Sequence, residues 1–419
     1  MKLFTHQQDV LEQTKDRNRV AYYLDMGLGK TFVGSEKMDA IGCKTNLLIC
    51  QNSKIQDWKE HFEKYYDYAV FVLRSPKEMK MFLKENLRAV GIINYELAWR
   101  RKELLSLQHF TLMLDESSLI QNSTAKQTKF VMKLNADNVI LLSGTPTSGR
   151  YENLWTQMKL LGYGISEELY LKQYVNYKLI KIGRVIHKTV DMDNPYKNVD
   201  RLKSKMRQHG AVFLKTEECF ELPEQNFITV KVPKSKEYTK FMKDDYVCVD
   251  GVELVGDTSL VKRLRARQLC GQYSKSKIEA FVDLVSSTQD RLVVFYNFND
   301  ELYLLSKICK DLGRTVAVVN GEKRELDAYE KHSDCVLMCQ YQAASMGLNL
   351  QTGNKIVYFT LPERSELFEQ SKKRIHRIGQ SKSCFYYVMM CKDSVDEKIY
   401  EALLMRKDFT DELFKEKDC

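Results

Sequence analysis

Near the amino end of the chain, a glycine-rich stretch carries residue types that bind phosphate. The stretch 24–31 is Leu-Asp-Met-Gly-Leu-Gly-Lys-Thr, and it follows a short apolar and aromatic run. Gly27 and Gly29 let the backbone approach an anion, and the N-terminus of a following helix offers unpaired N–H groups and about half a positive charge. Lys30 can reach the β- and γ-phosphates of a nucleotide, and the Thr31 hydroxyl can bind Mg²⁺. The stretch therefore predicts a phosphate-binding loop.

One position departs from the strict pattern. The pattern G-x-x-x-x-G-K-[ST] places a glycine at position 24, where this chain has Leu24. Taken alone, the shorter G-x-G-K-T also fits an ordinary turn or a chance match. The remaining motifs must decide between these interpretations.

A pair of carboxylates lies 85 residues after Lys30, at the end of an apolar run. The run is 110–114, and Asp115 and Glu116 follow it directly. An apolar strand that ends in two carboxylates is the expected partner of a phosphate loop. Asp115 would hold Mg²⁺ through water, and Glu116 would orient and deprotonate the attacking water.

The elements that must position these groups are apolar runs alternating with helical stretches. In the first half the runs are 20–24, 46–50, 89–95, 110–114 and 138–142, and in the second half they are 291–296, 315–319, 336–339 and 355–359. This alternation favours parallel α/β sheets with ligands at the carboxyl ends of the strands. Because there are two such series and one phosphate loop, we expect the second domain to complete the site of the first.

Length and composition describe a globular protein. The chain has 419 residues, 44% hydrophobic and 29% charged, and domains average about 150 residues. Residues 1–13 show no signal-peptide core, and the longest apolar run, 384–391, is too short for the ~18 residues that span a bilayer, so no membrane contact is predicted. Eleven cysteines without a CxxC pair and seven scattered histidines give no metal-ligand spacing. A reduced, cytoplasmic protein is predicted.

Positive charge is concentrated in one block. Residues 171–215 contain eleven Lys or Arg and three Asp, a net charge of +8 out of +9 for the whole chain. A block of this kind favours a polyanionic partner. A solvated helical surface is the alternative.

The ordered set of motifs resembles the Swi/Snf-type ATPases of helicase superfamily 2, in a short bacterial or phage form. Residues 25–31 are similar to the family's M-G-L-G-K-T motif, and helicases of this superfamily do not keep the glycine that Leu24 replaces. Residues 115–118 stand at the D-E-A-H box but lack its histidine. Residues 345–350 resemble G-x-G-x-N-L, and residues 370–380 resemble Q-x-x-x-R-x-H-R-I-G-Q without a gap. The resemblance runs from Gln7 to about Tyr400.

The resemblance implies roles for individual residues. Those expected to bind ATP are Gln7, through the adenine edge, together with Gly27, Gly29, Lys30, Thr31 and Gln370. Thr31 and Asp115 are expected to hold Mg²⁺ by way of water. Those expected to act in hydrolysis are Lys30, Asp115, Glu116 and two arginine fingers from the second domain, Arg374 and Arg377. Those expected to contact DNA or couple it to hydrolysis are Ser143, Thr145, Gly347, Asn349, Arg201, Lys203 and Lys205.

The implied fold is two tandem RecA-like parallel-sheet α/β domains with a helical basic insertion. We expect an ATP-binding lobe over 1–160, the insertion over 161–220, a linker with connecting helices over 221–280, and a C-terminal lobe with a terminal helix over 281–419. The implied activity is DNA-stimulated ATP hydrolysis that moves a monomer along duplex or forked DNA without sequence preference, in the cytoplasm of a bacterial or phage-infected cell.

Two alternatives remain open. One is a strand-separating helicase on DNA or RNA, for which the sequence shows no recognisable wedge hairpin. The other is a nucleotide-gated binding scaffold with weak turnover, which the missing histidine favours and the other motif residues oppose.

Overall fold

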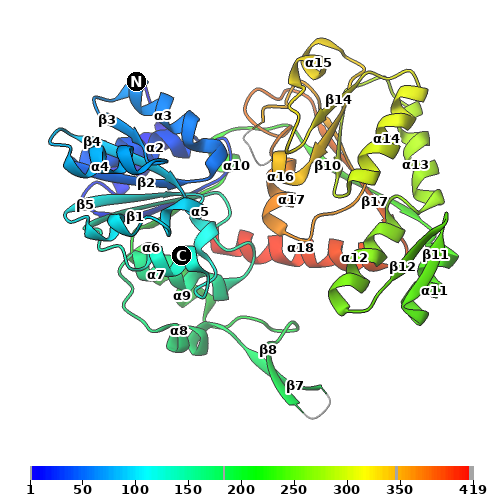
Figure 1. The fold of residues 1–419 in the computed structure, drawn as a ribbon, viewed down its shortest axis with the longest axis horizontal. Coiled ribbons are helices and arrows are strands. Elements are labelled where there is room, and N and C mark those ends of the chain that lie inside the picture. The colour runs from blue at the N-terminus through cyan, green and yellow to red at the C-terminus, as the bar shows by residue number, and fades with distance from the viewer. Residues whose placement is uncertain (1, 183–184, 345–347, 415–419) are drawn as a thin grey trace. The chain divides into compact units, whose positions relative to one another are not determined.

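The computed structural model describes residues 2–182, 185–344 and 348–414, which form two compact units (Figure 1). Unit 1 contains the residues up to Cys219 and those from Asp408 onward, and unit 2 contains Phe220–Lys407. The expected domain limits at residues 160, 220 and 280 stay predictions. The sequence did not predict that the chain from Asp408 onward belongs to unit 1.

Unit 1 is built on a seven-stranded parallel sheet with the order β3-β4-β2-β5-β6-β1-β9. Its strands are β1 (Arg19–Leu24), β2 (Thr45–Cys50), β3 (Ala69–Val72), β4 (Ala89–Asn94), β5 (Phe110–Asp115), β6 (Asn138–Ser143) and β9 (Ala211–Leu214). Strand β6 lies between β5 and β1. Because all three strands run in the same direction, the ends of β5, β6 and β1 emerge at one edge of the sheet.

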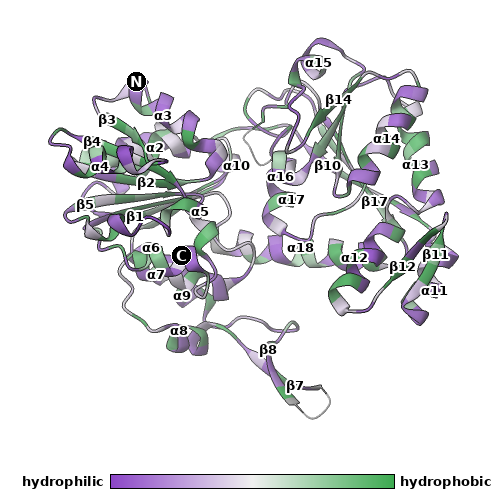
Figure 2. Cartoon of the chain, viewed as in Figure 1, coloured by the Kyte–Doolittle hydropathy of each residue, from purple (hydrophilic) through white to green (hydrophobic). Residues whose placement is uncertain are grey.

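The helices of unit 1 connect these strands. They are α1 (Thr5–Gln13), α2 (Lys30–Ile41), α3 (Ile55–Tyr65), α4 (Pro76–Lys84), α5 (Tyr95–Ala98), α6 (Lys126–Val131), α7 (Trp155–Leu160), α8 (Glu167–Tyr174), α9 (Val199–Gln208) and α10 (Thr216–Cys219). Strands β1, β2, β5 and β6 are buried along most of their length, and the hydrophobic colouring of β2 can be followed in Figure 2. Continuous apolar strands of this kind are expected where helices cover both faces of a sheet.

Part of the segment 161–220 departs from the helical expectation. It contains α8 and α9, but residues between them form an antiparallel hairpin of β7 (Tyr177–Ile182) and β8 (Val185–Val190). Its sequence is rich in β-branched residues on both sides of a glycine, a composition that favours strands over a helix. The segment also supplies β9, the edge strand beside β1.

Unit 2 is built on a six-stranded parallel sheet with the order β10-β17-β16-β13-β15-β14. Its strands are β10 (Gln225–Val232), β13 (Leu292–Tyr296), β14 (Val316–Val319), β15 (Val336–Gln340), β16 (Lys355–Tyr358) and β17 (Cys384–Cys391). The longest apolar run of the sequence is therefore a sheet strand. Two parallel α/β sheets in tandem confirm the expected fold class.

Both faces of the unit 2 sheet are buried. Val293 and Phe295 point into one hydrophobic cluster, and Leu292 and Val294 point into another on the opposite face. The helices of this unit are α11 (Lys236–Asp244), α12 (Ser259–Cys270), α13 (Lys275–Ser286), α14 (Asn299–Asp311), α15 (Leu326–Lys331), α16 (Tyr341–Ala344), α17 (Ser365–Lys372) and α18 (Val395–Phe414), whose last residues count in unit 1.

A small antiparallel hairpin of β11 (Tyr246–Val249) and β12 (Val252–Val255) packs on α11 and α12. Among the helices described, none is long and apolar enough to cross a membrane.

Candidate functional site

The phosphate loop joins the end of β1 to the start of α2. Gly27 and Gly29 have φ of +91° and +75°, a region that L-residues avoid. Gly29 is the N-cap of α2, and a Cβ atom there would lie 2.1 Å from Nε2 of Gln7. Both glycines are therefore required by the backbone, and the N-terminus of α2 presents its N–H groups at the sheet edge.

The Lys30 ammonium lies over the loop. Its Nζ donates to the carbonyl oxygens of Leu24 at 2.9 Å and Asp25 at 3.3 Å. A Cβ atom on Gly144, in the turn after β6, would lie 3.3 Å from the same Nζ. Thr31 is half-buried in the first turn of α2. The cation is thus held where the ends of β1 and β6 meet.

Gln7 is engaged by the loop itself. Its Nε2 donates to the carbonyl oxygen of Leu28 at 3.1 Å, and its Oε1 accepts from the Phe4 N–H at 3.0 Å. The side chain is buried between α1 and the loop. Its amide supports the loop geometry here, and adenine recognition stays a prediction.

The two carboxylates stand at the end of β5, as the sequence predicts. Asp115 Oδ2 accepts from Trp58 Nε1 at 2.8 Å. Glu116 has a φ of +56°, a conformation that costs on the order of 1–3 kcal/mol for a residue other than glycine. Burial raises the pKa of both carboxyl groups, and the nearby Lys30 ammonium opposes the rise in each.

Ser143 couples the Glu116 carboxylate to the end of β6. The Oγ atoms of Ser143 and Ser118 each donate to Glu116 Oε1 at 2.8 Å. Ser118 occupies the position at which the D-E-A-H box has histidine. The backbone N–H of Thr145 in turn donates to Ser143 Oγ at 3.2 Å. A hydroxyl network therefore replaces the histidine between the box and the segment 143–146.

This network changes the placement of two predicted DNA-contacting residues. Ser143 and Thr145 are both buried within unit 1. The described hydrogen bonds of Ser143 lead to the Glu116 carboxylate and to the Thr145 N–H, and the coupling and DNA-contacting roles of the two residues stay predictions.

Two contributors were not found from the sequence. The Gln157 side chain, fully buried on α7, accepts at Oε1 from Tyr23 OH at 3.0 Å and Ser117 Oγ at 2.8 Å, and it donates to the Pro146 carbonyl oxygen at 2.8 Å. Thr216 Oγ1 donates to Asp25 Oδ2 at 3.0 Å. Neither stands in a motif, although a buried glutamine in an apolar helix signals a hydrogen-bond network.

In unit 2 the structure brings two predicted residues together. Arg377 Nη1 donates to Asn349 Oδ1, and partial burial lowers the pKa of the guanidinium. Arg374 is buried, and its carbonyl oxygen accepts from the Leu350 N–H at 3.1 Å. The segments 348–353 and 370–380 therefore pack as one structural element. Gly347 lies outside the described residues.

Gln370, on α17, is also buried in unit 2. Its Oε1 has no hydrogen-bond partner in the described part of the chain.

The basic residues of α9 have different environments. Arg201 is exposed, and Lys205 donates to Gln208 Oε1 at 2.8 Å. Lys203 is buried and pairs with Glu412 at 2.7 Å. The expectation of Lys203 on a DNA-binding surface is therefore corrected. Lys203 lies on the buried face of α9, where it packs against the end of α18.

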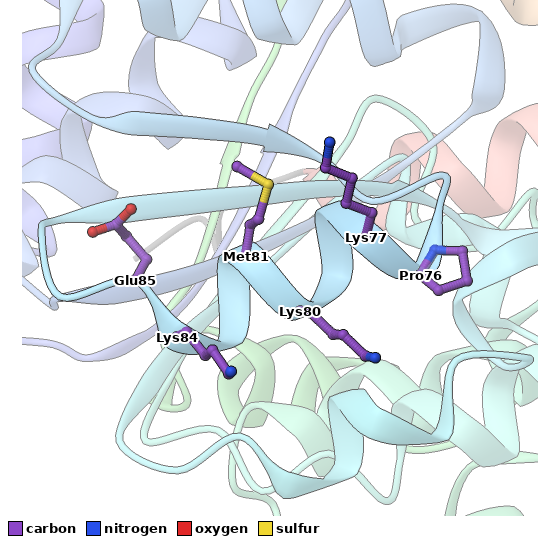
Figure 3. Close-up of a pocket in the computed structure, with 6 residues that line it drawn as sticks. All are labelled: Pro76, Lys77, Lys80, Met81, Lys84 and Glu85. Atoms are coloured by element: carbon purple, nitrogen blue, oxygen red, sulfur yellow. The ribbon is translucent and has the colours of Figure 1, made fainter.

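One group of potential metal ligands lies together within the described residues, in unit 2. Cys270, Cys391 and Asp396 are all buried there. The Lys277 ammonium already pairs with Asp396 at 2.5 Å, so a cation would have to compete with it. A separate pocket lies along α4 of unit 1 and is lined by Pro76, Lys77, Lys80, Met81, Lys84 and Glu85, none of them a predicted site residue (Figure 3).

Two protein-family models match successive parts of the chain and together cover most of it. The model of the SNF2-related domain matches residues 20–272, and that of the helicase conserved C-terminal domain matches residues 276–379. An uncharacterised ATP-dependent helicase of Mycoplasma pneumoniae is 23% identical over 90% of this chain and 38% of its own length.

A SWI/SNF-related matrix-associated actin-dependent regulator of chromatin, subfamily A-like protein 1, of Drosophila melanogaster is 24% identical over 96% of this chain and 54% of its own. The chain spans about half the length of the curated relatives it matches. Among solved structures, the Sulfolobus solfataricus SWI2/SNF2 ATPase core in complex with dsDNA is 20% identical, covers 98% of this chain and 92% of its own, and has a TM-score of 0.46.

Proposed function

Because the chain belongs to the SNF2-related domain family, we propose that it hydrolyses ATP with Mg²⁺ and uses the energy to move along double-stranded or forked DNA. One observation carries the proposal. At a single edge of the unit 1 sheet, the Lys30 ammonium donates to the phosphate loop and lies beside Gly144, and the neighbouring Ser143 donates to the Glu116 carboxylate. Through this contact, the proposed hydrolysis site is linked to the 143–146 turn, which can pass a conformational change to the rest of the unit.

The residues of the loop fit a nucleotide with Mg²⁺. The hydroxyl of Thr31 and the carboxylate of Asp115 are oxygen donors of the kind that Mg²⁺ prefers. Bound there, Mg²⁺ would neutralise charge on the phosphates. The glycine turn and the N-terminus of α2 bind phosphate oxygens, and Lys30 exchanges the loop carbonyls for the β- and γ-phosphates.

Glu116 is the proposed general base. Its Oε1 already accepts two hydroxyl hydrogen bonds, which hold the carboxylate in one orientation. Burial raises its pKa, and a raised pKa makes a carboxylate a better proton acceptor for the attacking water. Glu116, with its positive φ, directly follows the last residue of β5.

The remaining predicted residues take the roles expected from the family. Arg374 and Arg377 act as arginine fingers for the same nucleotide, a contribution of about 10³–10⁵ in rate. Gln7 and Gln370 contact ATP. Asn349 accepts a hydrogen bond from Arg377 and so positions its guanidinium. Arg201 and Lys205 contact DNA phosphates without reading sequence. The proposed motor is a cytoplasmic monomer.

The test compares ATPase rates with blunt duplex, forked duplex and single-stranded DNA, alongside displacement of a triplex strand. A duplex translocase hydrolyses ATP fastest with duplex or fork and displaces the third strand. If single-stranded DNA stimulates hydrolysis more than duplex does, or if no triplex is displaced, duplex translocation is the wrong assignment.

A strand-separating activity is the second candidate, because the structure contains an exposed hairpin in unit 1, within the segment that we expected to be helical.

A further inference from the structure

The β7–β8 hairpin exposes apolar side chains that no packing explains. The exposed fraction is 72% for Leu179, 64% for Ile186 and 39% for Ile180. Among the hairpin residues whose side chains are described, 177–181 and 186–190, none belongs to a hydrophobic cluster. The hairpin projects from the body of unit 1 beyond α8 (Figure 1). Large apolar side chains kept on an exposed ribbon indicate a binding surface.

The strand register places Leu179 and Ile186 on one face of the hairpin together with two lysines. Leu179 pairs with Lys188, and Lys181 pairs with Ile186, so the four residues alternate on the same side of the ribbon. Leu179 and Ile186 are diagonal neighbours in this arrangement. The result is an apolar pair flanked by two ammonium groups.

The charge of the hairpin is of one sign. Residues 177–190 contain four Lys or Arg and no Asp or Glu. Lys178, at the base, pairs with Asp191 at 3.2 Å and Asp193 at 3.1 Å. Lys181 and Lys188 have no ion pair in the part of the chain that is described, and Lys188 lies 4.1 Å from the Tyr177 ring centre. The surface that remains is apolar and cationic.

We propose that this hairpin is a DNA-contacting element that packs Leu179 and Ile186 against a base pair, with Lys181 and Lys188 on the adjacent phosphates. The inference rests on the proposed function and extends it to a specific structure in the DNA. Apolar side chains that insert at a base step partly unstack it, and neighbouring lysines bind the backbone. A fork junction offers such a base pair with one face open.

Charge complementarity selects this occupant. The hairpin lies inside the block 171–215 with its net charge of +8, and the exposed Arg201 belongs to the same block. A long polyanion can contact the exposed cations of this block together, and bases supply an apolar surface between two rows of phosphates. An anionic lipid surface presents the same two chemistries and is therefore an arm of the test.

The chain supplies a matched control. The hairpin β11–β12 exposes Val252 (45%) and Val255 (49%), yet residues 246–255 contain two acidic and no basic residues. Serine substitutions there remove exposed apolar surface of a similar kind from a hairpin without the proposed chemistry.

The experiment uses the full chain without nucleotide and a forked duplex with 2-aminopurine at the junction. We expect the unaltered protein to raise 2-aminopurine fluorescence as the base unstacks. Leu179→Ser/Ile186→Ser should abolish the rise and weaken fork binding about tenfold, because the apolar contact with the base pair is lost. Val252→Ser/Val255→Ser should leave both unchanged. ATPase activity stimulated by blunt duplex should stay within about twofold in both variants.

Two outcomes would overturn the inference. Fork binding and fluorescence in Leu179→Ser/Ile186→Ser that equal those of the unaltered protein would exclude base contact. Loss of binding to phosphatidylserine vesicles with fork binding unchanged would assign the hairpin to a membrane surface. A protein whose ATPase no DNA stimulates would refute the proposed function instead, because the fluorescence assay needs no hydrolysis.

Discussion

The two hairpins of this protein share a geometry and differ in chemistry. Both are two-stranded antiparallel ribbons outside the main sheets. In β11–β12, Val247 and Leu254 are buried against α11 and α12, so one face of the ribbon completes a hydrophobic core. In β7–β8, Leu179 and Ile186 are exposed and lysines alternate with them.

The difference shows how to distinguish a structural ribbon from a binding one. A two-stranded hairpin is marginally stable alone, so it needs either a core beneath it or a partner. The hairpin β11–β12 has the core and carries acidic residues toward solvent. The hairpin β7–β8 has cations and uncovered apolar side chains, which are features of a surface that binds.

The contrast between the two hairpins assumes that neither of them takes part in ATP hydrolysis. Glu116→Gln keeps the side-chain shape and removes the proposed base, so ATP turnover should fall about 10²–10⁴-fold. The hairpin variants should hydrolyse ATP normally. A steady-state ATPase assay checks both, with nucleotide binding to Glu116→Gln as the control for an intact loop. Normal turnover by Glu116→Gln would remove this residue from the chemistry.

A charge placed on each hairpin separates core from surface. Leu254→Asp buries an unpaired carboxylate and should lower the free energy of unfolding of unit 2 by about 3–5 kcal/mol. Leu179→Asp, on an exposed position, should change stability by no more than about 0.5 kcal/mol. Urea denaturation measures both values. Equal losses would mean that β7–β8 also covers a core.

The buried network around Gln157 tests whether unit 1 couples its site through hydroxyls and amides. Gln157→Ala leaves Ser117, Tyr23 and the Pro146 carbonyl without this partner. Unsatisfied buried polar groups cost about 1–3 kcal/mol in stability. We expect DNA stimulation of the ATPase to fall while ATP binding persists. Gln157→Glu keeps the acceptor and loses the donor, so it isolates the contact to Pro146. Unchanged stimulation in both variants would leave Gln157 a purely structural residue.

Helix α9 also contains one exposed cation, Arg201, and one buried cation, Lys203, and substitutions of these two residues should have the smallest effects. Arg201→Ala should reduce the slope of DNA affinity against salt by about one, without loss of stability. Lys203→Ala breaks the pair with Glu412 and should lower stability by roughly 1–3 kcal/mol. Its salt slope should stay the same. DNA titrations at several salt concentrations, with thermal melts, distinguish the two, and a slope change for Lys203→Ala would return it to the DNA surface.

Local patterns in the sequence were enough to place the residues of the phosphate loop and of the carboxylate pair in unit 1. Gly27, Gly29 and Lys30 occupy the loop, and Asp115 and Glu116 end β5, because a turn, a strand and their flanking residues are encoded within a few positions. The apolar runs predict most of the strands for the same reason. The apolar run at 384–391 entered the sequence analysis only as too short to span a bilayer, and the structure makes it β17, which is buried along most of its length.

Only the tertiary structure decided which distant side chains meet. Ser143 with Glu116, Gln157 with Tyr23, and Lys203 with Glu412 are separated by 27, 134 and 209 residues. Residue type alone does not determine whether a lysine such as Lys203 is exposed or paired, because burial depends on the helix face that the rest of the fold covers. The sequence determined the chemistry available at the loop. The fold determined which hydroxyls hold the Glu116 carboxylate, which cations stay exposed, and which hairpin leaves Leu179 and Ile186 exposed.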